Sequence, residues 1–199
     1  MIKRVSFCAT ILFLSVAFVY ISGHSQTSDK GEKNLPVENE PSPAHPHGKL
    51  NPKAPPETAQ FSFMIGEFDC KDKIQGADGK WTESDVVWNS TYFLNGSGIQ
   101  DRFWSKQVVA TGTRIFNKAK GKWIVNYFQT NPTYFAGVWE GKKEGSKMIM
   151  RAPRGENESR LTFHNITKDG FDWIGETALK DGSAKPFWII SCKRRRGGK

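Results

Sequence analysis

The sequence predicts an all-β protein in which a single antiparallel up-and-down sheet of about ten strands closes into one barrel. After Phe61 there is no convincing long helix, and short aromatic segments alternate with turns rich in Gly, Asn, Asp and Lys. Aromatic residues make up 13 % of the chain and include seven Trp, which is a large supply of rings for one interior. The connections are short, so successive segments are expected to pair as a meander, and closure of that meander removes exposed sheet edges.

The first 25 residues have the pattern of a secretory signal peptide. Residues 1–4 carry Lys and Arg, residues 5–22 are largely apolar, and Gly23 and Ser25 are small residues suited to a cleavage site. We expect cleavage after Ser25, although the apolar stretch is long enough to remain as an uncleaved membrane anchor. In either case the sequence predicts export, to the periplasm or the outside of the cell.

Residues 26–57 are predicted to be a Pro-rich disordered linker. Seven of the ten prolines fall there, and the segment has almost no apolar side chains to bury. His45 and His47 within it could contact a metal ion, but they lack partners at a fixed spacing. The sequence therefore predicts no metal site and no cofactor. The barrel is expected to span residues 58–194, and residues 195–199 form a basic tail.

The elements of the barrel follow in order. Thr58 is placed to cap a short helical turn that Gly66 ends, and the first strand begins at Glu67. Apolar Phe68, Cys70 and Ile74 alternate with charged residues along it, which is the period of a half-buried strand. The remaining strands are predicted at 81–94, 99–106, 108–117, 123–130, 134–140, 147–152, 160–167, 171–179 and 186–193, with a turn at 141–145 and a loop at 153–158.

The formal charge of +9 does not by itself indicate nucleic acid. Lys and Arg are spread through the turns and mixed with Asp and Glu, and the one dense cluster is the C-terminal end of the chain, a solvated tail. We find no nucleic-acid motif and no Gly-rich loop with phosphate-binding spacing. The predicted partner is a small molecule, and the oligomeric state stays open.

Cys70 and Cys192 are predicted to form a disulfide. They remain as a pair once Cys8 leaves with the signal peptide, and an oxidising compartment favours their bridge over two buried thiols. Cys70 lies on the first predicted strand and Cys192 on the last. In an up-and-down barrel those two strands are neighbours, so the bridge would pin the closing seam.

The chain also resembles a large bacterial group of lipocalin-like, or calycin-like, barrels that start with the motif F-x-F-x-x-G-E-[WF]. The resemblance rests on residues 61–70, which read FSFMIGEFDC, and on residues 94–101, which read LNGSGIQD. Later strands also fit, and the resemblance covers residues 61–194. Phe68 stands where the group usually has Trp. The resemblance implies the barrel fold, and it brings no catalytic residues.

Several inward-facing candidates could line a cavity. The aromatic ones are Trp88, Tyr92, Trp104, Tyr127, Trp139 and Trp173. An inward Arg114 could bind a carboxylate, and Asp101 or Arg102, which point to opposite faces, could recognise a polar group. His164 is the lone His of the barrel and could shuttle protons or bind haem, although a hydrogen-bonded His of the sheet is the simpler interpretation. The rings could equally fill the barrel and leave no cavity.

Three functions remain open at this point. The first is an exported barrel that binds a small, partly apolar molecule, which could be anionic. The second is an enzyme, an isomerase or hydrolase, that uses the same cavity through His164, Asp101 or Arg114. The third is a filled barrel that serves as a structural or interaction domain of the cell envelope. No catalytic residue can be assigned, because no motif joins a nucleophile to a base.

Overall fold

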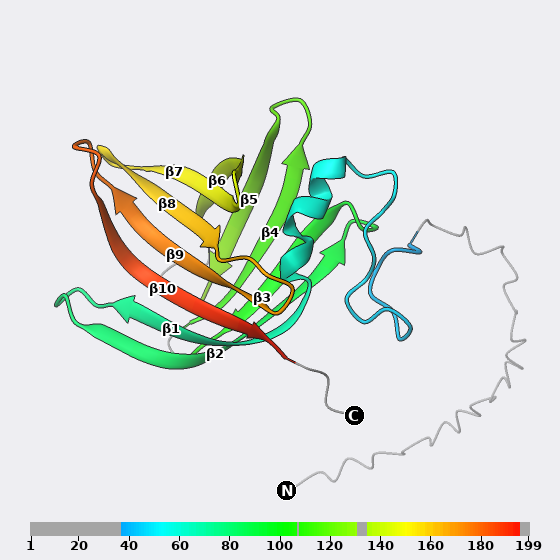
Figure 1. The fold of residues 1–199 in the computed structure, drawn as a ribbon, viewed down its shortest axis with the longest axis horizontal. Helices are drawn as coiled ribbons and strands as arrows, with labels where there is room; N and C mark the ends of the chain where they lie inside the picture. The colour runs from blue at the N-terminus through cyan, green and yellow to red at the C-terminus, as the bar shows by residue number, and fades with distance from the viewer. Residues whose placement is uncertain (1–36, 107, 131–134, 196–199) are drawn as a thin grey trace, which may run out of the picture. The chain divides into compact units, whose positions relative to one another are not determined.

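The computed structural model of the protein describes residues 37–106, 108–130 and 135–195, and in these residues ten strands form a closed antiparallel barrel (Figure 1). Each strand pairs with the next along the chain, and β1 pairs with β10. The predicted all-β, up-and-down class is confirmed. The elements are η1 (Pro56–Met64), β1 (Gly66–Gln75), β2 (Trp81–Phe93), β3 (Gly98–Trp104), β4 (Val109–Asn117), β5 (Lys122–Gln129), β6 (Phe135–Glu144), β7 (Lys147–Arg154), β8 (Asn157–His164), β9 (Gly170–Ala178) and β10 (Ala184–Arg194).

The short 3-10 helix η1 covers one end of the barrel with apolar side chains. Phe61 and Met64 have no exposed surface, and the Phe61 ring packs edge-on against Trp123, with 4.7 Å between the ring centroids. Arg194, at the end of β10, donates hydrogen bonds to the carbonyls of Phe63 (2.8 Å) and Ile65 (2.6 Å). These bonds satisfy carbonyls at the end of η1 and hold it against the barrel.

The predicted cap of η1 is wrong. Pro55 occupies the N-cap position without a side-chain hydrogen bond, and Pro56 begins the helix, where its missing N–H costs nothing. Thr58 is fully buried inside the element, and its hydroxyl has no partner among the described residues. Its role is packing at the barrel end.

Two connections are tighter than the sequence predicts. The expected turn at 141–145 is mostly strand, because β6 runs to Glu144 and Gly145 alone takes the left-handed backbone, with φ of 59°. The expected loop at 153–158 is likewise short, since Gly155 adopts φ of 60° and Pro153 pairs with Glu158. A single glycine with positive φ is enough to turn each hairpin, and the flanking residues stay in the sheet.

The part of the predicted linker that the structure describes is bound to the barrel. The backbone N–H of Tyr92 donates to the carbonyl of His47 (2.9 Å), the backbone N–H of Asn39 donates to Oδ1 of Asn95 (3.0 Å), and Asn51 Nδ2 donates to the Asn95 carbonyl (2.9 Å). Asn95 belongs to the turn between β2 and β3. Polar side chains thus attach residues 39–51 without the apolar burial that a sequence pattern detects. The predicted signal peptide, the first part of the linker and residues 196–199 lie outside the described residues.

The seam between β1 and β10 closes the barrel. Cys70 and Cys192 lie directly opposite each other in the register, form a disulfide and have Cα atoms 4.1 Å apart. Both are almost fully buried, so the bridge faces the interior, as expected. Arg195, assigned to the tail by sequence, extends the seam through hydrogen bonds to Asp69 on β1, and these bonds lower the pKa of the Asp69 carboxyl.

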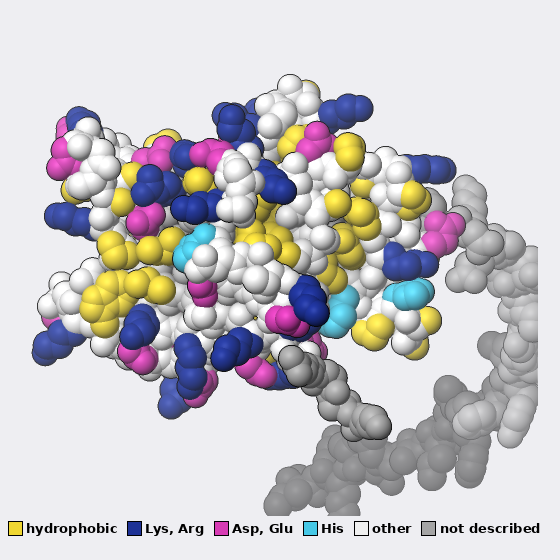
Figure 2. Space-filling model, viewed as in Figure 1, with side chains coloured by type: hydrophobic (Ala, Val, Ile, Leu, Met, Phe, Trp, Pro, Cys, Tyr) yellow, Lys and Arg dark blue, Asp and Glu magenta, His cyan; other side chains and the backbone are white. Residues whose placement is uncertain are grey.

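Charge is spread over the surface. Figure 2 shows Lys and Arg across the visible face with Asp and Glu among them. Many of these charges are paired: Lys73 of β1 with Glu83 of β2 at 2.5 Å, and Lys120, in the turn before β5, with Glu140 of β6 at 2.8 Å. Such exposed pairs contribute little to stability. Within the described residues there is no helix with the length and apolarity needed to cross a membrane.

The disulfide should dominate the stability of the seam. It closes a loop with a sequence separation of 122 residues, for which the chain-entropy model gives about 5 kcal/mol of stabilisation. We expect the double variant C70S/C192S to lose a large part of this amount, measured as the free energy of unfolding in urea.

Reduction of the wild-type protein is the matched comparison, because it opens the same bridge without a substitution. A reductant should lower the urea midpoint of the wild-type protein and leave that of C70S/C192S unchanged. Two free thiols at positions 70 and 192 in unfolded, unreduced protein would contradict the assignment.

Candidate functional site

The barrel contains an internal cavity of about 370 Å3. Its walls are mainly aromatic and aliphatic, and the lining comes from strands β2 to β10. The lining residues are Trp88, Asp101, Phe103, Ala110, Thr111, Arg114, Val125, Tyr127, Gln129, Ala136, Trp139, Met150, Arg154, Ser159, Leu161, Phe163, Trp173, Phe187, Trp188 and Ile190. Cavities of this size with few polar groups are typical of small-molecule sites.

The cavity has a closed end and an accessible end. Phe163 contacts Phe61 of η1 at 5.6 Å between ring centroids, so this part of the wall is covered by the helix. Met148 on β7 pairs with Phe163, and Arg154 lies six residues further along the same strand, about 20 Å away. Arg154 is exposed and still lines the cavity. The accessible end is therefore the one opposite η1.

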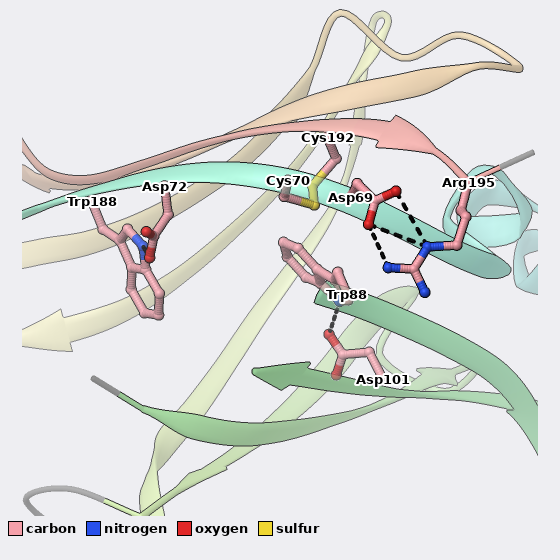
Figure 3. Close-up of a disulfide and its surroundings, with 8 residues drawn as sticks. All are labelled: Asp69, Cys70, Asp72, Trp88, Asp101, Trp188, Cys192 and Arg195. Carbon is pink, nitrogen blue, oxygen red and sulfur yellow. Dashed lines mark hydrogen bonds and ion pairs between the residues drawn. A yellow bond between two sulfur atoms is a disulfide. The ribbon is translucent and has the colours of Figure 1, made fainter. Parts of the chain in front are cut away.

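A buried polar cluster lies on the wall of the closed half. Asp101 accepts a hydrogen bond from Trp88 Nε1 at 2.7 Å (Figure 3) and one from the backbone N–H of Gly112 at 2.5 Å. Arg114 Nη1 lies 3.1 Å from Asp101 Oδ1, and both side chains are about 5 % exposed. A Cβ at position 112 would come within 2.6 Å of Asp101 Oδ1, so the close approach of the carboxylate requires Gly112.

Arg114 has hydrogen-bonding capacity left over. Its Nε and Nη1 groups are buried and have no hydrogen-bond partner within the described residues, because the contact with Asp101 is a close ion pair without hydrogen-bond alignment. The guanidinium lies 5.5 Å from the ring centroid of Phe61 and 5.6 Å from that of Phe163. These ring contacts hold the plane of the Arg114 guanidinium, but they provide no oxygen acceptor for its N–H groups. An oxygen acceptor in the cavity would satisfy a donor that is otherwise costly to bury.

Tyr127 supplies a further polar group on the same wall. Burial raises the pKa of its phenol well above the ordinary value, and the negative charge of Asp101 raises it further. The hydroxyl therefore stays protonated at any physiological pH and can donate a hydrogen bond. Its ring packs edge-on against Trp139 at 6.2 Å, which fixes its direction along the cavity.

A second buried carboxylate positions another wall residue. Asp72 on β1 is 1 % exposed and accepts hydrogen bonds from Ser84 Oγ at 2.6 Å and from Trp188 Nε1 at 3.3 Å. Trp188 lines the cavity and packs edge-on against Trp173 at 5.4 Å. Asp72 thus orients Trp188 as Asp101 orients Trp88, and Figure 3 shows each indole beside its carboxylate.

The structure places five of the eight sequence-predicted ligand residues on the cavity wall. They are Trp88, Arg114, Tyr127, Trp139 and Trp173. Tyr92 is buried but lies beyond the cavity lining, next to the turn between β2 and β3, where its backbone binds His47. Trp104 is 37 % exposed, because it alternates with the buried Phe103 and points outward.

His164 does not face the cavity. Phe163 is 1 % exposed and points inward, so His164 lies on the outer face of β8, where it pairs with Asp172 of β9. The interpretation of His164 as a hydrogen-bonding or surface residue of the sheet therefore fits its position better than a role in the cavity. No group of three or more His, Cys, Asp or Glu in the described residues is arranged to hold a metal ion.

Several lining residues have no signal in the sequence. The sequence predicts a loop at 153–158 and so gives no sign that Arg154 lines the cavity. Asp72, which accepts a hydrogen bond from the lining residue Trp188, stands between Lys71 and Lys73 and is easily taken for one more surface charge. Trp188 and Phe187 follow Pro186, where β10 changes register. The register change lets both rings line the cavity, which simple alternation would not predict.

Comparison with solved structures finds barrels of similar fold. The fold is similar to the solved structure of the S-type phycobiliprotein lyase CPES from Guillardia theta, with 9 % identity, a TM-score of 0.48, and coverage of 69 % of this chain and 92 % of that chain. A likeness of this strength says nothing about ligand or activity. No family model and no curated protein matches the chain.

The Asp101–Arg114 pair should be strongly coupled. D101N leaves the Arg114 charge buried without its anion, and we expect a loss of about 3–5 kcal/mol in the free energy of unfolding. R114M alone should also destabilise. The double variant D101N/R114M should lose about 1–3 kcal/mol less than the sum of the two single losses.

The half-exposed pair Arg151–Glu144, with 2.6 Å between its charged atoms, provides the control cycle. Its coupling should stay below about 1 kcal/mol, because water screens it. Equal coupling energies in the two cycles would show that burial does not strengthen the interaction between Asp101 and Arg114.

Tyrosine titration should reveal the buried phenols. The folded pKa of Tyr127 lies above the unfolded value near 10, so the unfolded state releases its proton first and stability falls as pH rises beyond 10. We expect the free energy of unfolding of the wild-type protein in urea to drop between pH 9 and pH 11, by up to about 1.4 kcal/mol per pH unit for this group.

The Y127F variant should show a smaller drop over the same range and one fewer late-ionising phenol in absorbance at 295 nm. Burial also raises the pKa of Tyr92, so Y92F is the comparison for a phenol beyond the cavity lining. An unchanged pH dependence in Y127F would count against a buried Tyr127.

Proposed function

We propose that the protein is exported and binds a small, partly apolar molecule inside the barrel. The observation that carries this proposal is a cavity of about 370 Å3 with aromatic walls and a buried guanidinium whose N–H groups lack acceptors. The apolar walls favour a hydrophobic body, and Arg114 favours an oxygen acceptor on it. Tyr127 offers a second donor on the same wall.

Binding has more support than catalysis. Asp101 already accepts from Trp88 and Gly112 and pairs with Arg114, so its lone pairs are largely committed and it is a poor general base. His164 lies away from the cavity lining. The described part of the cavity wall thus offers no nucleophile paired with a base, as an isomerase or hydrolase would need.

A filled structural barrel has less support for a different reason. Trp88, Trp139 and Trp173 leave open volume between them, although each could have packed the centre. The indoles of Trp88 and Trp139 are held back by hydrogen bonds to Asp101 and to Ser159 on the wall. An interior kept open by specific wall contacts is consistent with an occupant.

The proposed export rests on the signal pattern at the N-terminus together with the Cys70–Cys192 disulfide, which is expected in an oxidising compartment. N-terminal sequencing of protein from the periplasm or medium should begin at Gln26; Met1 would instead indicate the uncleaved anchor. We also place the chain with the bacterial lipocalin-like group that its 61–70 motif resembles.

Filling the cavity should abolish binding. Ala110 lies on the wall in β4, and A110F would occupy part of the volume. Native mass spectrometry of the wild-type protein purified from its own host should show a bound small molecule, and A110F should lose it. Titration with the neutral fluorescent probe N-phenyl-1-naphthylamine should saturate at one site per wild-type chain and fall at least tenfold in affinity for A110F.

The matched control is I115F, on the outer face of the same strand, where the side chain is 37 % exposed. It adds a ring of the same kind without entering the cavity and should bind like the wild type. Equal binding by A110F and the wild type would overturn the proposal, provided that both keep the same thermal midpoint.

A further inference from the structure

The charges of the cavity wall are divided between its two ends. Among the described lining residues only Asp101, Arg114 and Arg154 carry charge. Asp101 and Arg114 form a pair in the closed half and compensate each other. Arg154 lies at the accessible end and leaves the cavity with one positive charge in excess.

Arg154 has no ion-pair partner in the described part of the chain. The nearby acidic residues are engaged elsewhere: Glu156 with Lys180 at 3.0 Å, Glu158 with Arg151 at 3.4 Å, and Glu176 with Arg160 at 3.1 Å. The Arg154 guanidinium lies 5.0 Å from the ring centroid of Phe187, another lining residue. This contact keeps the cation at the cavity edge and leaves its N–H groups in contact with solvent.

The two ends therefore suit different chemical groups. An anion in the closed half would approach the carboxylate of Asp101 in a region with little water, where like charges repel strongly. A neutral oxygen would satisfy the free N–H groups of Arg114 without that repulsion. At the accessible end an anion meets an unpaired guanidinium and can keep part of its hydration.

We infer that the ligand is an elongated amphipathic monoanion that binds in one direction. Its carboxylate, sulfonate or similar group contacts Arg154 at the accessible end, and a carbonyl, ether or hydroxyl oxygen contacts Arg114 in the closed half. The apolar body lies between them against the aromatic walls. This inference rests on the proposed function, since it assigns the direction of a ligand in the same cavity.

Two probes of nearly the same shape test the direction. The first is 8-anilinonaphthalene-1-sulfonate, which carries one negative charge, and the second is N-phenyl-1-naphthylamine, its uncharged analogue. The wild-type protein should bind the sulfonate more tightly. R154Q should weaken the sulfonate about three- to tenfold and change the neutral probe less than twofold, whereas R154K should restore part of the loss.

The K71Q variant is the control for the change in net charge. Lys71 lies on the outer face of β1, 77 % exposed and paired with Asp85, so its loss removes one positive charge far from the wall. It should leave the affinities of both probes unchanged. Raising the salt concentration should weaken the sulfonate in the wild type more than in R154Q, because screening acts on the charge that R154Q removes.

The outcomes separate this inference from the proposed function. If R154Q binds both probes as the wild type does, or if a folded R114Q loses the sulfonate while R154Q keeps it, the charged group lies in the closed half and the inference is overturned. If neither probe binds the wild-type protein, or if a folded A110F binds both probes as tightly as the wild type does, the proposed function itself fails.

Discussion

The pairing of β1 with β10 is the contact on which the rest of the structure depends. Without it the ten strands would be an open sheet with two unpaired edges, and the aromatic face would have nothing opposite it. The disulfide between Cys70 and Cys192 sits within this pairing and faces inward. The first strand, which carries Asp72, is thereby fixed beside the last, which carries Trp188, and their hydrogen bond becomes part of the cavity wall.

Inside the closed barrel, hydrogen bonds to buried carboxylates decide how much space remains. A Trp ring with a free N–H would turn toward any acceptor, whereas Trp88 and Trp188 are each committed to an Asp on the wall. The rings therefore stand as walls and do not collapse into the centre. Arg114 is held between Phe61 and Phe163 in the same way, so its charge is fixed while part of its donor capacity is unused.

The sequence predicts the barrel well because its signals are local. Alternation along β1, the Asn95–Gly98 turn and the spacing of the aromatic strands each depend on neighbouring residues, and all of them agree with the structure. The pairing of Cys70 with Cys192 follows from the closure of a meander. The cavity set is only partly predictable: alternation divides each strand into two faces but does not say which face is inside. Trp88, Trp104, Arg114 and His164 are therefore equal candidates in the sequence, whereas in the structure only Trp88 and Arg114 of these four line the cavity.

The remaining differences come from interactions between distant parts of the chain. Asn39 and Asn51 bind the turn at Asn95 through amide hydrogen bonds, which leave no apolar pattern in the sequence. Asp72 looks like one more charge in a charged strand until Ser84 and Trp188 are seen beside it. The sequence predicts a loop at 153–158, yet the hairpin keeps Arg154 in the sheet at the cavity edge.

The contacts of Arg194 also have a consequence for how the chain matures. This residue ends the last strand and binds the carbonyls of Phe63 and Ile65, next to the first strand, so the two ends of the domain must meet before η1 is held in place. No shorter segment of the chain contains the complete wall, because its lining comes from β2 through β10. A chain that still lacks β10 thus has no complete pocket. Cys70 meets Cys192 and the wall closes only when the last strand pairs with the first, so a complete cavity is also the mark of a finished barrel.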